Sequence, residues 1–294
     1  MSRTIDSILV PTDGSDGARM GARRGIDLAA TTGADLHILS VVDTREVEPD
    51  QTSLGHAGRR LEEQKEQAVD SIAELARSRL PGGITTAVER GVPFQTINEY
   101  TQAHDIDLIV MGTQGRTGME RVLLGSVAEK TLRTATVPTV TVTPDADIDE
   151  VGRGSYDDIL LPTDGSEEAE VAIEWGLTFA DLYDATVHTV YSVATSRFGS
   201  TEGVAEIHDA LEQTGWNALE TVRNRAREAG ISVAGSVASG PAARTIFAYR
   251  EEHDIDLVVM GTHGRSGVSR YLIGSVTESV VRNAPVPVCA VPMQ

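Results

Sequence analysis

The feature that most constrains the fold is a glycine-rich stretch that occurs twice in the chain. In the first copy, the tetrapeptide GTQG at 112–115 is followed after nine residues by GS at 125–126. In the second copy, GTHG at 261–264 is followed after nine residues by GS at 274–275. A fixed spacing that returns in full indicates that both stretches serve the same structural purpose.

Each copy lies between the same two kinds of segment. An apolar run precedes it, at 106–111 and 255–260, and a segment with helical pattern follows it, at 127–135 and 276–284. A strand, a glycine-rich loop and a helix start form a cradle for phosphate. The glycines let the backbone approach an anion, and the free N–H groups of the first helical turn point at it. The sequence therefore predicts two anion-binding loops.

The rest of the first half alternates between strand and helix patterns. Apolar runs predict five strands, at 7–11, 36–42, 84–89, 106–111 and 138–143, and apolar spacings of three and four predict helices at 18–32, 61–80, 95–104 and 127–135. The segment 43–60 has no clear period and contains Pro49, Gly55 and Gly58, so we predict a long loop there. Gly91 is predicted to lie in a turn.

This alternation is typical of an α/β fold with a parallel sheet and helices on both faces. Right-handed crossovers place the carboxyl ends of the strands along one edge, and ligands bind at that edge where the strand order reverses. Asp13 and Gly112 each follow the end of a predicted strand. We therefore expect them to face one crevice, although they lie far apart in the chain.

The second half repeats the first as a whole domain. DILLPTDGS at 158–166 matches SILVPTDGS at 7–15, and HDIDLVVMG at 253–261 matches HDIDLIVMG at 104–112. The acidic, glycine-containing segment between the repeats has no period and is typical of a linker. We predict a first domain at 1–144, a linker at 145–155 and a second domain at 156–294.

The composition excludes several classes of protein. A net charge of −19 argues against a general binder of nucleic acid or anionic membranes. Lys65 and Lys130 are the only lysines, and acid excess with so little lysine indicates either a halophile or an acidic proteome from a GC-rich genome. Cys289 is the only cysteine, which rules out an intrachain disulfide. No apolar run approaches the roughly 20 residues of a membrane helix, and no signal peptide precedes Pro11, so we expect a cytoplasmic protein.

With the PTDGS turns and the spaced glycine loops established, both halves resemble the universal stress protein family. That family's nucleotide-binding signature is Gly-x-x-Gly, nine residues, then Gly-Ser/Thr, and it occurs twice here. The resemblance covers nearly all the chain outside the linker. It implies two repeated, doubly wound domains, each with a five-stranded parallel sheet, of the adenine nucleotide alpha hydrolase-like kind. It also implies binding of ATP or AMP, with Mg²⁺ carried by the phosphates, and dimers formed through the last strand.

The resemblance also implies roles for individual residues. Asp13 and Asp164 would contact the ribose or adenine, and Val41 would face adenine through its backbone. The glycines and serines of the loops would hold the phosphates, and Arg116 and Arg265 would screen the phosphate charge. The implied nucleotide-binding residues are Pro11, Thr12, Asp13, Val41, Met111, Gly112, Gly115, Arg116, Gly125, Ser126 and Val127, with Pro162, Thr163, Asp164, Met260, Gly261, Gly264, Arg265, Gly274, Ser275 and Val276 in the second half.

Several of these residues have a structural alternative. Ser126 with Glu129, and Ser275 with Glu278, fit a Ser-x-x-Glu capping box that uses the same N–H groups as a phosphate would. Asp13 and Asp164 can bond the backbone of their own turns, as aspartate before glycine often does. Met111 and Met260 end buried strands, where packing explains them as well as a nucleobase contact does. His37 and His188 lie in apolar strands, where packing is a better explanation than ligand binding.

The second half departs from the first at the expected adenine end. Ser192 and Ala194 stand where the first half has Val41 and Asp43. The base-binding part of the second site is therefore less well defined by the resemblance than its phosphate-binding part.

Three functions remain open at this point. The first is a nucleotide-binding regulatory or stress-response protein that signals to an unidentified protein partner. The second is a slow ATP hydrolase or nucleotidyl transferase, although the sequence lacks a P-loop lysine and an evident general base. The third is a scaffold without a ligand. The sequence also predicts an internal pseudo-dimer, with the last strands at 137–143 and 286–291 in contact, and allows a homodimer of whole chains.

Overall fold

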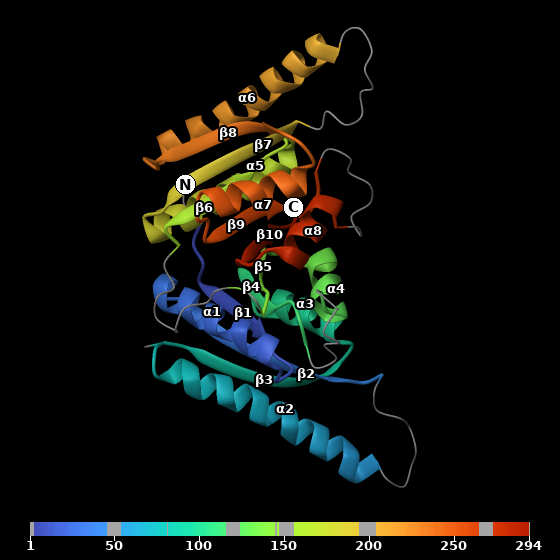
Figure 1. The fold of residues 1–294 in the computed structure, drawn as a ribbon. Helices are drawn as coiled ribbons and strands as arrows, with labels where there is room; N and C mark the ends of the chain where they lie inside the picture. The colour runs from blue at the N-terminus through green and yellow to red at the C-terminus, as the bar shows by residue number, and fades with distance from the viewer. Residues whose placement is uncertain are drawn as a thin grey trace. The chain divides into compact units, whose positions relative to one another are not determined.

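The computed structural model describes residues 3–45, 54–80, 82–115, 124–144, 146, 156–193, 204–264 and 273–293. The chain divides into two compact units (Figure 1). The first half is Thr4–Gly154, and the second half is Ser155–Gln294 together with the N-terminal residues Met1–Arg3. Most of the predicted linker at 145–155 lies outside the described residues, so the domain boundaries stay a prediction.

The first half is an α/β unit around a five-stranded sheet. Its strands are β1 (Ser7–Pro11), β2 (Asp35–Asp43), β3 (Ile84–Gly91), β4 (Leu108–Gly112) and β5 (Thr139–Val142). Its helices are α1 (Asp16–Thr32), α2 (Leu54–Arg77), α3 (Pro93–Ala103) and α4 (Ser126–Thr134). Within this unit the strand order is β3-β2-β1-β4-β5 and the pairs are parallel.

The second half has the same order of elements. Its strands are β6 (Asp158–Pro162), β7 (Thr186–Val193), β8 (Val233–Ser239), β9 (Leu257–Gly261) and β10 (Val288–Val291). Its helices are α5 (Glu167–Tyr183), α6 (Val204–Glu228), α7 (Ala242–Glu252) and α8 (Ser275–Asn283). The strand order within this unit is β8-β7-β6-β9-β10, again with parallel pairs.

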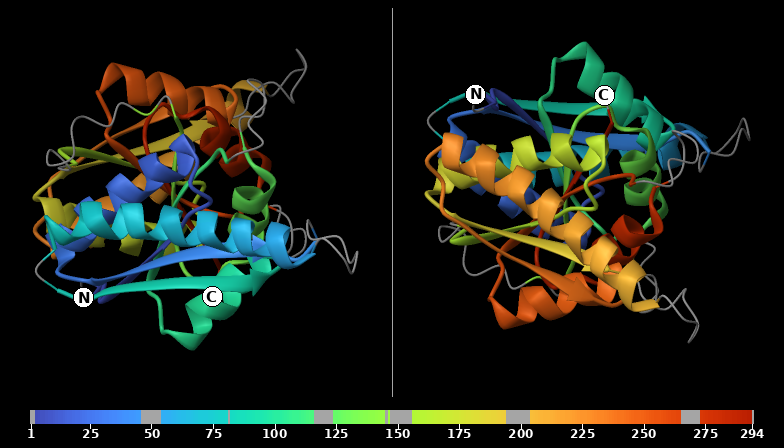
Figure 2. Two further views of the ribbon diagram at one scale, coloured as in Figure 1. Left: turned by 90° about the horizontal axis from the view of Figure 1, so that it is seen from below. Right: turned by 90° about the horizontal axis from the view of Figure 1, so that it is seen from above.

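Helices cover both faces of each sheet, which confirms the predicted fold class. In the first half α1 and α2 pack on one face, and α3 and α4 lie on the other (Figure 2). In the second half α5 and α6 cover one face, and α7 and α8 the other. None of the described helices combines the length and the apolar character needed to cross a membrane.

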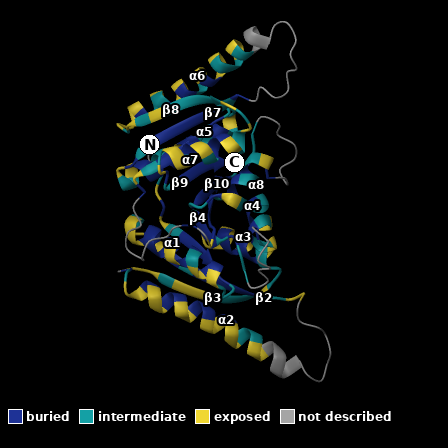
Figure 3. Cartoon of the chain, viewed as in Figure 1, coloured by how far each residue is buried: buried dark blue, intermediate teal, exposed yellow. Residues whose placement is uncertain are grey.

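The core is aliphatic, as the low aromatic content requires. The central strands are buried on both faces, and Ile8, Leu9, Leu108 and Ile109 are fully enclosed (Figure 3). Near-continuous apolar runs are typical of parallel strands that are covered on both sides. These runs gave sharp sequence signals, so the predicted strands agree with the observed ones to within two residues.

One predicted loop is wrong in part. The segment 43–60 was expected to be irregular, but α2 already begins at Leu54 and includes Gly55 and Gly58. Each glycine disfavours a helix by about 1 kcal/mol relative to alanine. Extending a helix that is already nucleated on a packed surface adds one hydrogen bond for each residue, which offsets that penalty. Residues 46–53 lie outside the described residues.

Gly91 lies where the chain turns from β3 into α3. It is the last residue of β3, and α3 begins two residues later with Pro93 in its first turn. A side chain at this position would collide with Thr96 Oγ1 in that turn. Gly91 is therefore required by the close approach of a helix to the strand end.

The repeated HDIDL segments have a structural explanation. Asp105 and Asp254 have φ values of 49° and 48°, in the left-handed region that closes the turn after α3 and α7. The next aspartate in each copy bonds the start of the first strand. Asp107 Oδ2 accepts hydrogen bonds from the N–H groups of Asp6 (2.9 Å) and Ser7 (3.0 Å). Asp256 Oδ2 accepts from Asp157 (2.9 Å) and Asp158 (3.0 Å).

We predict that Asp107→Ala lowers the free energy of unfolding of the first half by about 2 kcal/mol, because two backbone N–H groups lose a charged acceptor. Asp105→Gly is the matched control, since glycine adopts the left-handed region without strain, and it should be neutral or slightly stabilising. Urea denaturation measures both. Equal destabilisation by the two variants would contradict this role for the Asp107 carboxylate.

His37 and His188 are packed side chains, as expected. His37 Nδ1 is 3.0 Å from the Tyr100 hydroxyl, and His188 Nδ1 is 3.2 Å from that of Tyr249. Burial lowers the pKa of His37, the positive charge of His104 lowers it further, and Asp35 opposes both. The neutral imidazole is thus the form that the folded first half favours.

We predict a pH-dependent contribution of His37 to stability. Its folded pKa lies below the unfolded value of about 6.5, so the unfolded chain binds the proton more readily. The contribution is complete above about pH 6.5 and is lost as the pH falls through the folded pKa. His37→Gln should therefore melt with less loss of Tm between pH 7.5 and pH 5 than the parent. Parallel Tm profiles of the two proteins would contradict this assignment.

Candidate functional site

The strand order of the first half reverses between β1 and β4. From β1 the chain builds outward through β2 and β3, then returns to place β4 and β5 on the other side of β1. In open α/β sheets this is the point where ligands bind, beyond the carboxyl ends of the strands. The PTDGS turn follows β1 and the first glycine loop follows β4, so the fold brings the two motifs to one crevice.

The turn after β1 is built by its own side chains. Gly14 N–H donates to Thr12 Oγ1 (3.1 Å), and Ser15 N–H donates to Asp13 Oδ1 (2.9 Å). Ser15 then caps α1, since its Oγ accepts from Ala18 N–H (3.2 Å). Gly14 has a φ of 85°, which favours glycine. The motif therefore fixes the direction of the Asp13 side chain before any ligand binds.

The glycine loop closes on itself where α4 begins. Gly125 N–H donates to the carbonyl of Thr113 (2.6 Å), and α4 starts at the next residue, Ser126. The N–H groups of Ser126, Val127 and Ala128 belong to the first helical turn and have no partner within the helix. They give this end of the crevice a partial positive charge, which favours an anion.

The predicted capping boxes are wrong. The N-cap of α4 is Gly125 and that of α8 is Gly274, and neither helix is capped by a side chain. Glycine holds the cap because the chain must approach the preceding strand closely, and a Cβ at Gly125 would lie only 3.2 Å from Thr113 O. Ser126 is consequently an exposed first-turn residue, with its hydroxyl outside the cap.

The glutamates of the predicted boxes pair with arginines one turn later. Glu129 lies 2.7 Å from Arg133, and Glu278 lies 2.8 Å from Arg282. Both pairs are spaced by four residues along their helix, an arrangement that stabilises a helix modestly.

Asp13 meets the glycine loop at Gly115. A Cβ added at Gly115 would lie 2.7 Å from Asp13 Oδ2, closer than a side chain can approach without displacing the carboxylate. Gly264 and Asp164 repeat this contact at the same 2.7 Å. Asp13 Oδ1 thus bonds its own turn, as the structural alternative predicted, while Oδ2 faces the loop.

Two glycines of α1 bring that helix against the loop. A Cβ at Gly17 would collide with the carbonyl of Gln114, and one at Gly21 would collide with the backbone at Gly112. The backbone of α1 thus packs directly against the backbone of the loop, with no side chain between them. The aligned positions in α5 are Glu168 and Ala172, so this support is less close in the second half.

The turn and the loop line one cavity of about 240 Å³ in the first half. Ten of the residues implied by the family resemblance line it, namely Pro11, Thr12, Asp13, Val41, Met111, Gly112, Gly115, Gly125, Ser126 and Val127. Arg116 and Arg265 lie outside the described residues. Sequence reasoning missed further lining residues, among them Asp43, Arg45, Leu61, Lys65, Pro93 and Ile97.

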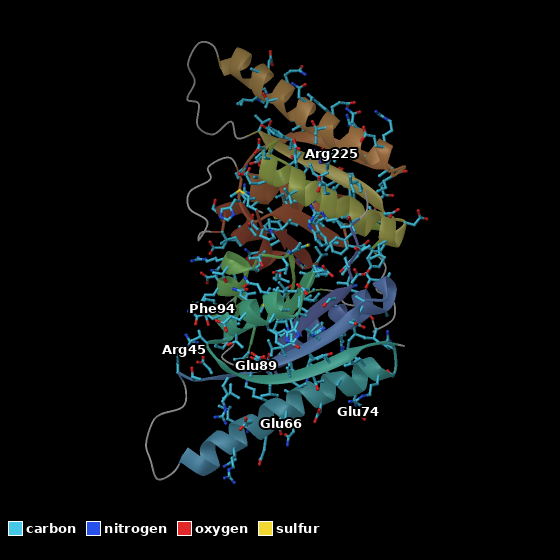
Figure 4. All side chains as sticks on the ribbon, turned by 180° about the vertical axis from the view of Figure 1, so that it is seen from behind. Arg45, Glu66, Glu74, Glu89, Phe94 and Arg225 are labelled. Atoms are coloured by element: carbon cyan, nitrogen blue, oxygen red, sulfur yellow. The ribbon has the colours of Figure 1, made fainter. Side chains whose placement is uncertain are left out.

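The rim of the cavity at the end of β2 is charged. Arg45 Nε donates to Asp43 Oδ1 (2.9 Å), and this hydrogen bond is the main reason that the pKa of the Asp43 carboxyl is lowered. Lys130 lowers that pKa further and lies over the Phe94 ring at 5.3 Å. Arg45 and Phe94 are labelled at this end of the first half (Figure 4).

The second half repeats the turn and the glycine loop more closely than the end of β2. Thr163, Asp164 and Gly165 form the same turn, and Gly274 N–H closes the loop on Thr262 O at 2.8 Å. Met260, Gly261, Gly264, Ser275 and Val276 keep the positions of their first-half counterparts along β9, the loop and α8. At the end of β7, however, Ser192 Oγ donates to Gly240 O (2.7 Å), a bond that its counterpart Val41 cannot form.

Comparisons with known proteins agree with this architecture. The family model described as the universal stress protein family matches residues 4–143 and again 155–292. Universal stress protein MJ0531 of Methanocaldococcus jannaschii is 36% identical over 146 residues, which is 48% of this chain and 84% of that protein. Universal stress protein Slr1230 of Synechocystis is 24% identical and covers 97% of this chain and 99% of its own length.

Solved structures share the fold. A universal stress protein from Archaeoglobus fulgidus superposes with a TM-score of 0.73 at 22% identity, covering 99% of both chains. A putative universal stress protein from Pseudomonas aeruginosa superposes with a TM-score of 0.62 at 21% identity, covering 98% of this chain and 93% of that chain.

The two family matches together span nearly the whole chain and coincide with the repeated units. The chain belongs to the universal stress protein family and carries its domain twice.

Proposed function

We propose that this protein binds an adenine nucleotide, ATP or AMP, and acts as a stress-response or regulatory protein. The observation that carries the proposal is the corner formed by the Asp13 carboxylate, Gly115 and the start of α4. An acceptor for sugar hydroxyls and a set of amide donors for an anion border the same cavity. That pairing suits a phosphorylated nucleoside.

Each part of the cavity has a role in this proposal. The amides of the glycine loop and of the first turn of α4 hold the phosphates. Asp13 Oδ2 accepts hydrogen bonds from the ribose, and Val41 and Met111 contact the base. Mg²⁺ would be carried by the phosphate oxygens, because the described His, Cys, Asp and Glu residues offer no group of three that could hold a metal ion.

Nucleotide binding would order the crevice and alter a surface that a protein partner reads. A slow ATP hydrolase or nucleotidyl transferase and a ligand-free scaffold remain the alternatives, and the experiments below separate them. The pairing of the last strands, within one chain or between two, stays a prediction from the sequence.

We predict that Gly115→Val weakens ATP binding to the first half at least tenfold. The added Cβ would displace the Asp13 carboxylate and crowd the phosphate approach. Isothermal titration calorimetry, with the second site disabled by Gly264→Val, measures the change. Gly82→Val is the matched control, since an added Cβ there meets its nearest atom only at 4.0 Å. Unchanged affinity in the Gly115 variant would refute the phosphate role of the loop.

We predict that Asp13→Asn removes the preference for ATP over 2′,3′-dideoxy-ATP. The asparagine oxygen can still accept from Ser15 N–H, so the turn is kept while an amino group replaces the acceptor Oδ2. Hydrogen bonds to a charged group are worth about 1.5–3 kcal/mol, so the parent should prefer ATP about tenfold or more. The same preference in both proteins would exclude Asp13 as the ribose ligand.

A phosphate-release assay on the same pair of proteins addresses the hydrolase alternative. Steady release of phosphate by the parent that Asp13→Asn abolishes would favour an enzyme. Absence of any nucleotide effect on the Tm of the parent would favour a scaffold.

A further inference from the structure

The two lysines of the chain both belong to the first half. They are Lys65 in α2 and Lys130 in α4, and the other basic residues of the chain are arginines. Lys130 is an exposed residue near the rim, over the Phe94 ring. Lys65, in contrast, is only 8% exposed and lines the cavity.

The burial of Lys65 is unusual for its helix. Glu66 and Glu74 lie on the outer face of α2 and are exposed, and both are labelled in Figure 4. Lys65 instead continues the apolar stripe that faces the sheet, between Leu61 and Ala68. Lysine is rarely buried without an anionic partner. Lys65 has an interaction within the protein, so it is not an isolated buried charge. It also lines the cavity, so it would face a ligand bound there.

A chain of contacts links the helix of Lys65 to the Asp13–Gly115 corner of the cavity. Ala68 lies one helical turn after it on the same face of α2. The Ala68 Cβ lies 3.1 Å from where a Cβ of Gly14 would stand, so this face of α2 touches the turn after β1. The next residue back in that turn, Asp13, meets Gly115 of the loop. The face of α2 that carries Lys65 therefore adjoins the turn of Asp13, and Lys65 borders the same cavity as the Asp13–Gly115 corner.

The second half lacks this lysine and fills its space differently. The pattern of burial along α2 at 61–67 is the same as that along α6 at 211–217, which aligns Lys65 with Gly215. A Cβ at Gly215 would lie 2.7 Å from Tyr191 Cδ1. Tyr191 is the counterpart of Ser40 in β2 and is 4% exposed, packed with Leu219.

The two halves thus differ at two equivalent positions, one in a strand and one in a helix. The first half has a serine in the strand and a lysine in the helix, and the second half has a tyrosine and a glycine. Both pairs fill the space between sheet and helix, but only the first adds a positive charge. A buried charge is poorly screened by salt, so it acts on a bound anion more strongly than an exposed one.

We propose that Lys65 contacts the ligand of the first half and makes that half the site that selects a nucleoside triphosphate over a nucleoside monophosphate. The triphosphate carries more negative charge toward the Gly115 corner, so it gains more from the ammonium group. The second half, with Gly215 and Tyr191, lacks this preference. The inference rests on the proposed nucleotide-binding function.

The test is calorimetry of ATP and AMP binding to the full chain, with the second site disabled by Gly264→Val. Lys65→Met keeps the length of the side chain and removes its charge. We expect its Kd for ATP to rise about tenfold or more and its Kd for AMP by less than about threefold, because a charged hydrogen bond is lost with ATP alone. Lys65→Arg should keep the preference for ATP.

Lys130→Met is the matched control, since it removes the chain's other lysine. Its effect on the Kd for ATP should be less than about threefold and should vanish at 1 M salt, because exposed charges are screened. The effect of Lys65→Met should persist at that salt concentration. An ATP affinity of Lys65→Met equal to the parent's, or equal losses for ATP and AMP, would overturn the proposal.

A transplant to the second half does not depend on the stability of the Lys65 variant. Tyr191→Ser with Gly215→Lys, in a chain whose first site is disabled by Gly115→Val, should raise the ratio of ATP to AMP affinity about tenfold. No change in that ratio would count against the proposal. If the parent chain binds neither nucleotide, the proposed function itself fails, and this outcome is distinct from a parent that binds ATP without need of Lys65.

Discussion

The contact between the Asp13 carboxylate and Gly115 depends on where two strands end. β1 and β4 are neighbours in a parallel sheet whose order reverses between them, so their carboxyl ends open onto one crevice. The turn after β1 presents a carboxylate, and the loop after β4 presents backbone amides. Any residue larger than glycine at position 115 would force the two apart. The site is therefore a property of the sheet topology, and the glycines allow it to close.

Close contacts between backbone segments explain why glycines gather around the crevice. Gly17 and Gly21 let α1 lie on the backbone of the loop, and Gly125 lets the loop return to Thr113. A helix N-cap made by glycine leaves the first-turn amides to an external anion. Packing of backbone on backbone is rigid, since it involves no side chains that can change rotamer. The described ends of the loop, 112–115 and 124–126, are thereby held by backbone contacts.

Duplication has preserved these contacts unevenly. The turn, the loop closure and the contact of Asp164 with Gly264 recur in the second half almost unchanged. The differences lie at the end of β7, where Ser192 bonds Gly240, and between the sheet and α6, where Tyr191 and Gly215 replace Ser40 and Lys65. Each exchange preserves packing while it changes hydrogen bonding or charge. Two copies of one domain can in this way keep one fold and differ in the side chains that line the same crevice.

The strands, the repeat, the family and the two motifs could be predicted from the amino-acid sequence, because buried runs and spaced glycines are local patterns. The sequence also contained a signal for Lys65, a lysine within the apolar stripe of α2, whose meaning depends on what that stripe faces. Only the tertiary structure decided that α2 begins at Leu54, that Gly125 rather than Ser126 caps α4, and that Asp107 bonds the start of β1. These features arise where segments distant in the chain meet, and a helix cap or a buried charge takes its role from that partner.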